Sequence, residues 1–160
     1  MNISRSLPIA LIVLVSPGIA LINAATPISF GGLPLRFEIN KGQADSKVQY
    51  LARGSGYSVL LTPDAVTFNL RPSKKKKGSA VSMLLIKADK KAAAVPSQIL
   101  PTKSNYFRGK DSRSWMANLD NYGRLTYSNV NPGIDAVYYG TQGQLEYDFV
   151  VAAGSDPSAI

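Results

Sequence analysis

The sequence predicts an all-β protein in which two antiparallel sheets pack as a jelly-roll-like β-sandwich. Apolar and polar residues alternate with period two along much of the chain, which is the pattern of half-buried strands. Short turn sequences containing Gly, Pro, Asn or Asp separate these alternating stretches. After residue 24 no stretch has the apolar spacing of a long amphipathic helix. Together these observations predict about eight strands joined by short turns.

The first strand is predicted at residues 33–40. Its odd-numbered residues are apolar, whereas its even-numbered residues are Pro34, Arg36, Glu38 and Asn40. Successive side chains of a strand point to opposite faces, so the apolar set is expected to face the core and the other set the solvent. Pro34 places the start of this strand at a sheet edge or a strand end.

Three further strands are predicted at residues 48–53, 57–62 and 65–71. Residues 54–56, Gly-Ser-Gly, join the first pair, and Pro63 and Asp64 join the second pair. Short connections between alternating stretches are typical of antiparallel hairpins. These strands are therefore expected to form a meander.

The middle of the chain is expected to hold one strand between two polar connections. Residues 74–77 are four consecutive lysines, which we interpret as a solvated loop that discourages strand pairing. Residues 80–88 predict a strand. Residues 89–97 predict a linker between two halves of one sheet system, in which Pro96 ends any helical turn.

Residues 104–127 form the least regular stretch of the sequence. Tyr106, Phe107, Trp115 and Tyr122 are spread among Asn, Asp, Ser and Gly residues. We expect a long ordered connection whose aromatic side chains cover one end of the core. A second hypothesis is a carbohydrate-binding platform, in which Trp115, Tyr122 and Tyr106 stack on a sugar, since aromatic rings offer an apolar face with a polar edge.

The last part predicts a strand at residues 124–130 and then a hairpin over residues 134–151. With the turn centred on residues 142 and 143, Asp135, Glu146 and Asp148 share the outer face. The side chains of Glu146 and Asp148 lie about 6–7 Å apart along the strand. We expect these acids to be solvated or paired with Lys or Arg. The spacing also leaves open a cation site, calcium above all, or a catalytic pair acting on glycans.

Composition excludes several chemistries. The 160 residues contain no Cys and no His, which excludes disulfides, Cys/His zinc sites, Cys nucleophiles and His-based triads. No cofactor is expected. The formal net charge of +8 favours anionic partners such as acidic polysaccharide. Nucleic-acid binding is not expected, because no aromatic residues are interleaved with the lysine run.

The N-terminal segment has the features of an export signal. Arg5 precedes an apolar stretch at residues 7–22, and Ala24 ends a small-residue cleavage motif. Residues 1–24 are thus predicted to be a cleaved signal peptide, with an uncleaved membrane anchor as the alternative. Residues 25–160 form the predicted β-sandwich domain of a secreted or cell-surface protein.

The segments LARGSGY, PGIDAVYYG and LEYDFVVAAGSDPSAI carry a family resemblance. Over residues 33–160 the chain resembles the N-terminal domain, of unknown function, of bacterial secreted proteins with seven-bladed β-propeller-type repeats. The resemblance implies secretion, a β-rich module and downstream propeller-type repeats as partners, and it supplies no catalytic residues. It also implies that the chain is a truncated module whose sandwich is incomplete at the C-terminus.

From these observations we predict a non-catalytic structural or interaction module of a secreted or cell-surface bacterial protein. The first alternative is a carbohydrate-binding module that uses the exposed aromatics. The second is a glycan-active enzyme with Glu146 and Asp148 as its carboxylate pair.

Overall fold

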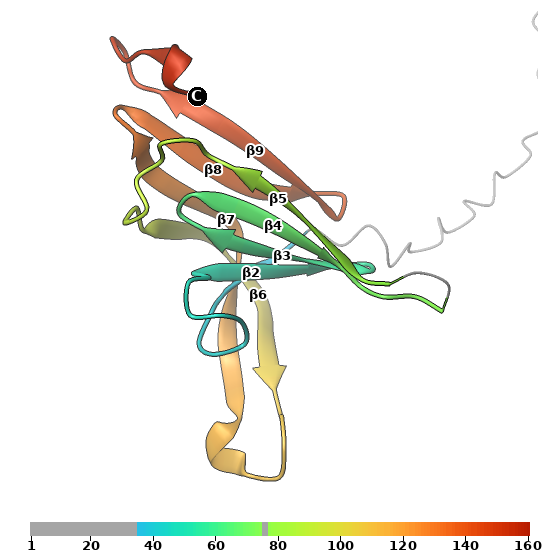
Figure 1. Ribbon diagram of the computed structural model, residues 1–160. Coiled ribbons are helices and arrows are strands. Elements are labelled where there is room, and N and C mark those ends of the chain that lie inside the picture. The colour runs from blue at the N-terminus through green and yellow to red at the C-terminus, as the bar shows by residue number, and fades with distance from the viewer. Residues whose placement is uncertain (1–34, 75–76) are drawn as a thin grey trace, which may run out of the picture.

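The computed structural model describes residues 35–74 and 77–160, which form a single antiparallel sheet of nine strands (Figure 1). Two short 3₁₀ turns, η2 (Ser112–Ser114) and η3 (Pro157–Ala159), complete the described secondary structure. The all-β prediction is confirmed. The strands are β1 (Phe37–Ile39), β2 (Tyr50–Gly54), β3 (Tyr57–Thr62), β4 (Ala65–Leu70), β5 (Ser79–Leu84), β6 (Ala94–Tyr106), β7 (Met116–Asn131), β8 (Ile134–Thr141) and β9 (Gln144–Val151).

The long strand β7 organises the sheet. Tyr122 of β7 pairs with Phe37 of β1 on one side and with Ile99 of β6 on the other. Further along, Arg124 pairs with Tyr139 of β8 on the side opposite β6. Strands β1 and β8 therefore follow one another along the same side of β7. From this branch point, β1 to β5 run one way and the β8–β9 hairpin the other.

The junction of β1 and β8 requires glycine. A Cβ atom built on Gly140 of β8 would lie 2.5 Å from the Cβ of Leu35, which leads into β1. A side chain at position 140 would push the two branches of the sheet apart, and Gly140 lets their backbones meet.

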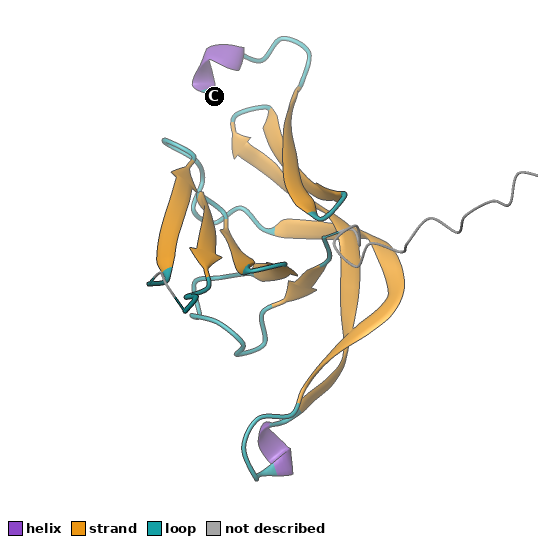
Figure 2. Cartoon of the chain, turned by 90° about the vertical axis from the view of Figure 1, so that its right-hand side faces the viewer, coloured by secondary structure: helices purple, strands orange, loops and turns teal. Residues whose placement is uncertain are grey.

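The sheet curls into a half-barrel, and a sandwich of two separate sheets is not confirmed (Figure 2). The sequence pattern does not separate these architectures, because both alternate apolar and polar residues. Here the sixteen residues of β7 pair with three different strands, and the register shifts between Tyr127 and Asn131. Such irregularities bend a strand, so one sheet can enclose the core.

The core lies on the inner, concave face of the half-barrel. Its fully buried members come from both branches of the sheet, and partly buried Tyr57, Phe68, Met83, Leu145 and Phe149 pack against it. Burial of these side chains provides the main stabilisation of a chain without disulfides. The largest core residues are Leu35, Phe37, Val59, Leu61, Val66, Leu125, Tyr127, Val130, Ile134 and Tyr138.

The prediction of an irregular connection at residues 104–127 is wrong. Strands β6 and β7 form a long two-stranded ribbon that extends away from the half-barrel to the η2 turn (Figures 1 and 2). No residue of β6 is buried, and residues 116–118 at the start of β7 are not buried either, so burial imposes little alternation on this part of the sequence. The linker predicted at residues 89–97 likewise contains the start of β6.

The predicted meander and the final hairpin are present with the expected register. Strand β3 coincides with residues 57–62, and in the hairpin Asp135 pairs with Val150 and Tyr139 with Glu146. The predicted division into faces holds less well. Alternation places Val137 on the outer face with Asp135 and Asp148, yet Val137 is buried. Tyr147, opposite the core residue Tyr138, is on the inner face but is exposed because β9 is an edge strand.

The predicted signal peptide and Lys75 and Lys76 of the lysine run lie outside the described residues. Within the part of the chain that is described, no helix has the length and apolar character of a membrane span.

Candidate functional site: an outer-face polar cluster and three sheet edges

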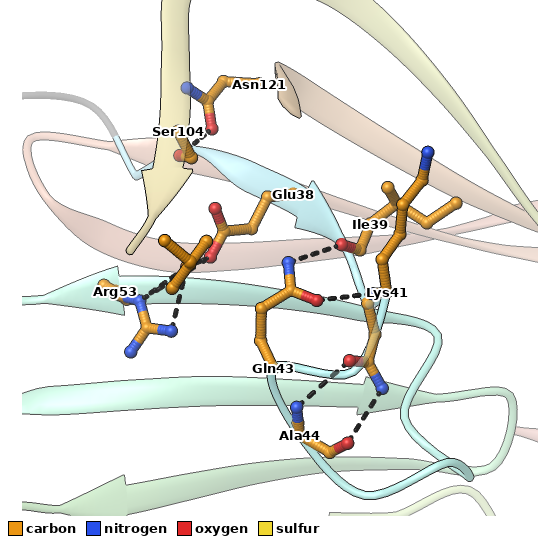
Figure 3. Close-up of polar contacts among 10 residues, drawn as sticks. Glu38, Ile39, Lys41, Gln43, Ala44, Arg53, Ser104 and Asn121 are labelled. Atoms are coloured by element: carbon orange, nitrogen blue, oxygen red, sulfur yellow. Dashed lines mark hydrogen bonds and ion pairs between the residues drawn. The ribbon is translucent and has the colours of Figure 1, made fainter. Parts of the chain in front are cut away.

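A buried carboxylate lies at the centre of a polar cluster on the outer face of the sheet (Figure 3). The hydroxyl of Tyr106, at the end of β6, donates a hydrogen bond to Glu38 of β1. The same hydroxyl accepts hydrogen bonds from Nε and Nη2 of Arg53 on β2, at 3.1 and 2.9 Å. Arg53 Nε lies 3.6 Å from the Glu38 carboxylate, whose side chain is 5% exposed. The cluster therefore joins β1, β2 and β6.

Ser104 and Asn121 lie beside this cluster and are hydrogen-bonded to each other. The Asn121 amide donates to the backbone oxygen of Thr102, and Asn121 Oδ1 accepts from the Ser104 hydroxyl at 2.9 Å. Asn121 is 1% exposed, so these bonds compensate its burial. A small cavity of about 50 Å³ opens between Arg36, Glu38, Arg53, Ser104, Tyr106 and Asn121.

The pKa of Tyr106 is raised, first by burial and then by its hydrogen bond to Glu38, while Arg53 acts in the opposite direction. The phenol thus stays protonated at neutral pH and keeps donating to the carboxylate. We call Glu38, Arg53 and Tyr106 the latch, because their hydrogen bonds hold the end of β6 against β1 and β2.

A second outer-face groove adjoins the latch. The guanidinium carbons of Arg53 and Arg108 lie 5.2 and 5.6 Å from the centre of the Tyr106 ring, within cation–π range. The groove holds about 300 Å³, and its wall includes Arg53, Arg108, Ser58, Asn69 and Asp45. Two guanidinium groups and several hydrogen-bonding side chains give it the chemistry to bind an anionic, hydroxyl-rich molecule.

The β1–β2 loop, with Gln43 and Ala44 (Figure 3), forms another part of this wall, and Asn40 organises the loop. Its side-chain oxygen accepts from the backbone N–H groups of Gly42 and Ala44, each at 3.1 Å. Its amide donates to the backbone oxygens of Asp45 and Val48 at 2.8 and 2.9 Å. One side chain thereby satisfies four backbone groups and fixes the loop beside the groove.

The three aromatic residues of the predicted sugar platform do not converge. Trp115 lies at the tip of the β6–β7 ribbon and makes an edge contact with Phe107 at 5.3 Å. Tyr122 is half-buried and packs against the core residue Tyr50 at 6.5 Å. Tyr106 belongs to the latch. The structure therefore provides no single aromatic surface made of these three rings.

The predicted acidic residues share the outer face of the β8–β9 hairpin. Glu146 and Asp148 are exposed on β9, and Asp135 accepts a hydrogen bond from the backbone of Asn129 at 2.7 Å. The pKa of Tyr139, across from Glu146, is raised by desolvation and then by Asp148 and Glu146. Among the described residues, no three Asp, Glu, His or Cys side chains are placed to hold a metal ion.

Among the described residues, the sheet ends at three edges without a further strand, and two of these edges carry protective features. Strand β6 contains Pro96 and Pro101 and a register shift between Leu100 and Lys103, which disfavour further pairing. Strand β9 carries Glu146 and Asp148. Strand β5 has neither Pro nor charge, and Val81 and Leu84 are 59% and 62% exposed. Strand β5 is therefore the unprotected edge.

An apolar groove runs along the inner side of the β5 edge. It holds about 410 Å³, within the range of ligand-binding pockets. Near it the Tyr57 hydroxyl donates to the backbone oxygen of Gly143 at 2.6 Å and joins the two branches of the half-barrel. The groove is lined by Tyr57, Phe68, Leu70, Val81, Gln144 and Leu145.

Sequence patterns do not reveal the latch. Period-two alternation places Glu38 on the solvent face together with Arg36, and Glu38 is buried by Tyr106, which lies 68 residues later in the chain. The unprotected β5 edge had a visible signal, since Ser79–Ile86 is an uncharged and largely apolar stretch.

A family model described as a domain of unknown function (DUF7948) matches residues 37–160. No curated protein matches the chain. No solved structure matches it either.

Proposed function

We propose that this chain, which belongs to the DUF7948 family of domains of unknown function, is a non-catalytic interaction or structural module of a secreted or cell-surface bacterial protein. One observation carries the proposal: β5 ends the sheet as an apolar strand without the charges, prolines or bulges that protect edges. Such a strand is suited to accept a strand from another polypeptide.

The architecture supports this proposal. A strand added along β5 would extend the β2–β5 branch over the groove and give the two-layered sandwich that the sequence predicts. The downstream propeller-type repeats are candidate partners. The export signal predicted at residues 1–24 supports a secreted location, and its removal leaves one positive charge fewer than the formal +8.

The experiment compares two matched substitutions, each of which places a lysine on one edge strand. Leu84 of β5 and Val150 of β9 are both exposed on the outer face, so lysine at either position should leave the core intact. The probe is an uncharged peptide of alternating valine and threonine, and binding is followed by fluorescence anisotropy. We expect Leu84→Lys to abolish binding and Val150→Lys to preserve it. Equal effects of the two variants, or no binding to the wild type, would contradict the proposal.

A second candidate function is binding of an acidic glycan at the outer-face groove. It is favoured by the position of Arg53 and Arg108 beside hydrogen-bonding side chains. Titration with an oligogalacturonate should change Trp115 fluorescence, since Trp115 lies close to Arg108 in the ribbon tip, and Arg108→Gln should weaken that response. A neutral oligosaccharide is the control. An unchanged affinity in Arg108→Gln would exclude this site.

A further inference from the structure

Strand β5 carries no charged residue on either face. Its inner-face residues Val81 and Met83 lie against the groove and the core, whereas Ala80, Ser82 and Leu84 share its outer face. Ile86, just beyond the strand, is 71% exposed. Edge strands normally carry charge, proline or a bulge that blocks further pairing, and β5 has none of these. The exposed edge of β5 is therefore a surface that another strand completes.

We infer that β5 binds an extended segment of a partner polypeptide as an additional antiparallel strand, with apolar residues in its centre and acidic residues at its C-terminal end. This inference rests on the proposed interaction function and specifies the partner's chemistry. Every strand pair of the sheet is antiparallel, so an antiparallel addition continues the existing hydrogen-bond pattern.

The apolar centre follows from what such a strand would contact. Its inward side chains would fill the groove beside Val81, Phe68 and Leu145, which is almost entirely apolar. Its outward side chains would lie beside Ala80, Ser82 and Leu84, none of which is charged. Charged inward residues at the centre would lose hydration in the groove without gaining a partner.

We infer the acidic C-terminal end of the partner strand from the positive charge in the loop that precedes β5. Arg71, Lys74 and Lys77 are exposed in the β4–β5 loop, and none forms an ion pair with another described residue. At the other end of β5, Lys87 lines a cavity together with Asp156, and Lys90 forms an ion pair with Asp64 at 3.8 Å. The basic excess lies beside Ser79, where an antiparallel strand places its C-terminal end.

A second copy of the chain fits this surface less well. The acids of its β9 edge, Glu146 and Asp148, lie within the strand and would face the uncharged centre of β5. They would not reach the basic loop while the apolar residues stay in register. Charge complementarity therefore favours a segment with terminal acids.

Two isomeric peptides test the inference on the full chain. One has alternating valine and threonine followed by acidic residues, and the other has the same residues with the acids at the N-terminus. We expect the first to bind about three- to tenfold more tightly at low ionic strength, with the difference shrinking at high salt. Hydrogen exchange should show protection of the β5 amides and unchanged β9 amides.

Three results would overturn the inference in distinguishable ways. Equal affinities of the isomers, or a preference that survives Lys74→Gln with Lys77→Gln, would remove the charge argument and leave the interaction function standing. Binding of the peptides without protection of β5 would show that the site is elsewhere. Concentration-dependent self-association that protects β5 would identify a second copy as the occupant. Sedimentation velocity measures this last outcome directly.

Discussion

The edge strands β5 and β9 border the same half-barrel, but their sequences protect them differently. Strand β9 alternates apolar residues with Glu146 and Asp148, and four of the eight residues of its hairpin partner β8 are buried. Strand β5 carries no charge and is backed by β4, in which Val66 is buried and Phe68 is half-exposed. Charged edges resist pairing, whereas apolar edges attract it. This difference is the basis of our proposal that β9 ends the sheet, whereas β5 accepts a further strand.

The largest expected loss of stability comes from removing the aromatic ring next to each edge strand. Tyr138 of β8, which pairs with β9, is 2% exposed and contacts the rings of Tyr127 and Tyr147. Tyr138→Ala should lower the free energy of unfolding by about 3–5 kcal/mol. Phe68→Ala, in the strand β4 that pairs with β5, should lower it by about 2 kcal/mol, because the half-exposed ring leaves a smaller cavity. Urea unfolding measures both. Equal losses would mean that the two edges are equally supported.

Alkaline pH should lower the stability of the protein through Tyr138, which pairs with Tyr147 of β9. Burial, and then the charge of Tyr147, raises the pKa of Tyr138 to about 12. A raised folded-state pKa gives stability that is complete below pH 10, the unfolded value of about 10, and that is lost as pH rises through 12. We expect a slope of about 1.4 kcal/mol per pH unit for this group. Thermal unfolding at graded pH should show the slope in the wild type and a reduced slope in Tyr138→Phe.

Loss of the hydrogen bond between Tyr57 and Gly143, which joins the two branches, should lower the free energy of unfolding moderately. Removing the Tyr57 hydroxyl, which donates to Gly143, should cost about 1 kcal/mol and loosen the β8–β9 turn. Tyr57→Phe keeps the ring against Phe68, so packing is preserved. Hydrogen exchange should then rise at residues 141–144 and stay unchanged in β3. A faster exchange throughout the sheet would show that the bond supports the whole fold.

The smallest effect on stability tests the protective role of the acids on β9. Replacing Glu146 by Gln and Asp148 by Asn removes exposed charges and should change the free energy of unfolding by less than about 0.5 kcal/mol. The same change should allow β9 to pair with a strand of another molecule, as we propose for β5. Sedimentation velocity should detect more self-association than in the wild type. An unchanged profile would show that features other than charge protect β9.

Much of the local structure could be predicted from particular sequence patterns. The stretch 57–62 and the hairpin register around residues 142 and 143 follow from alternation and turn chemistry, which act between near neighbours. The pairing of β6 with β7 could not be predicted in this way, because β6 has no buried residue and its exposure places little constraint on the order of apolar and polar residues. Residue type alone suggests a common site for Trp115, Tyr122 and Tyr106, and only their positions in space separate them.

The sequence is sufficient to establish an all-β protein with tight hairpin turns and without cysteine or histidine chemistry. Alternation and turn residues are local properties, and composition needs no fold. Only the tertiary structure decided that one sheet curls into a half-barrel, that Glu38 is buried beneath Tyr106, and that the apolar strand β5 lies at an edge. These features depend on pairing and burial between residues far apart in the chain, which no local pattern records.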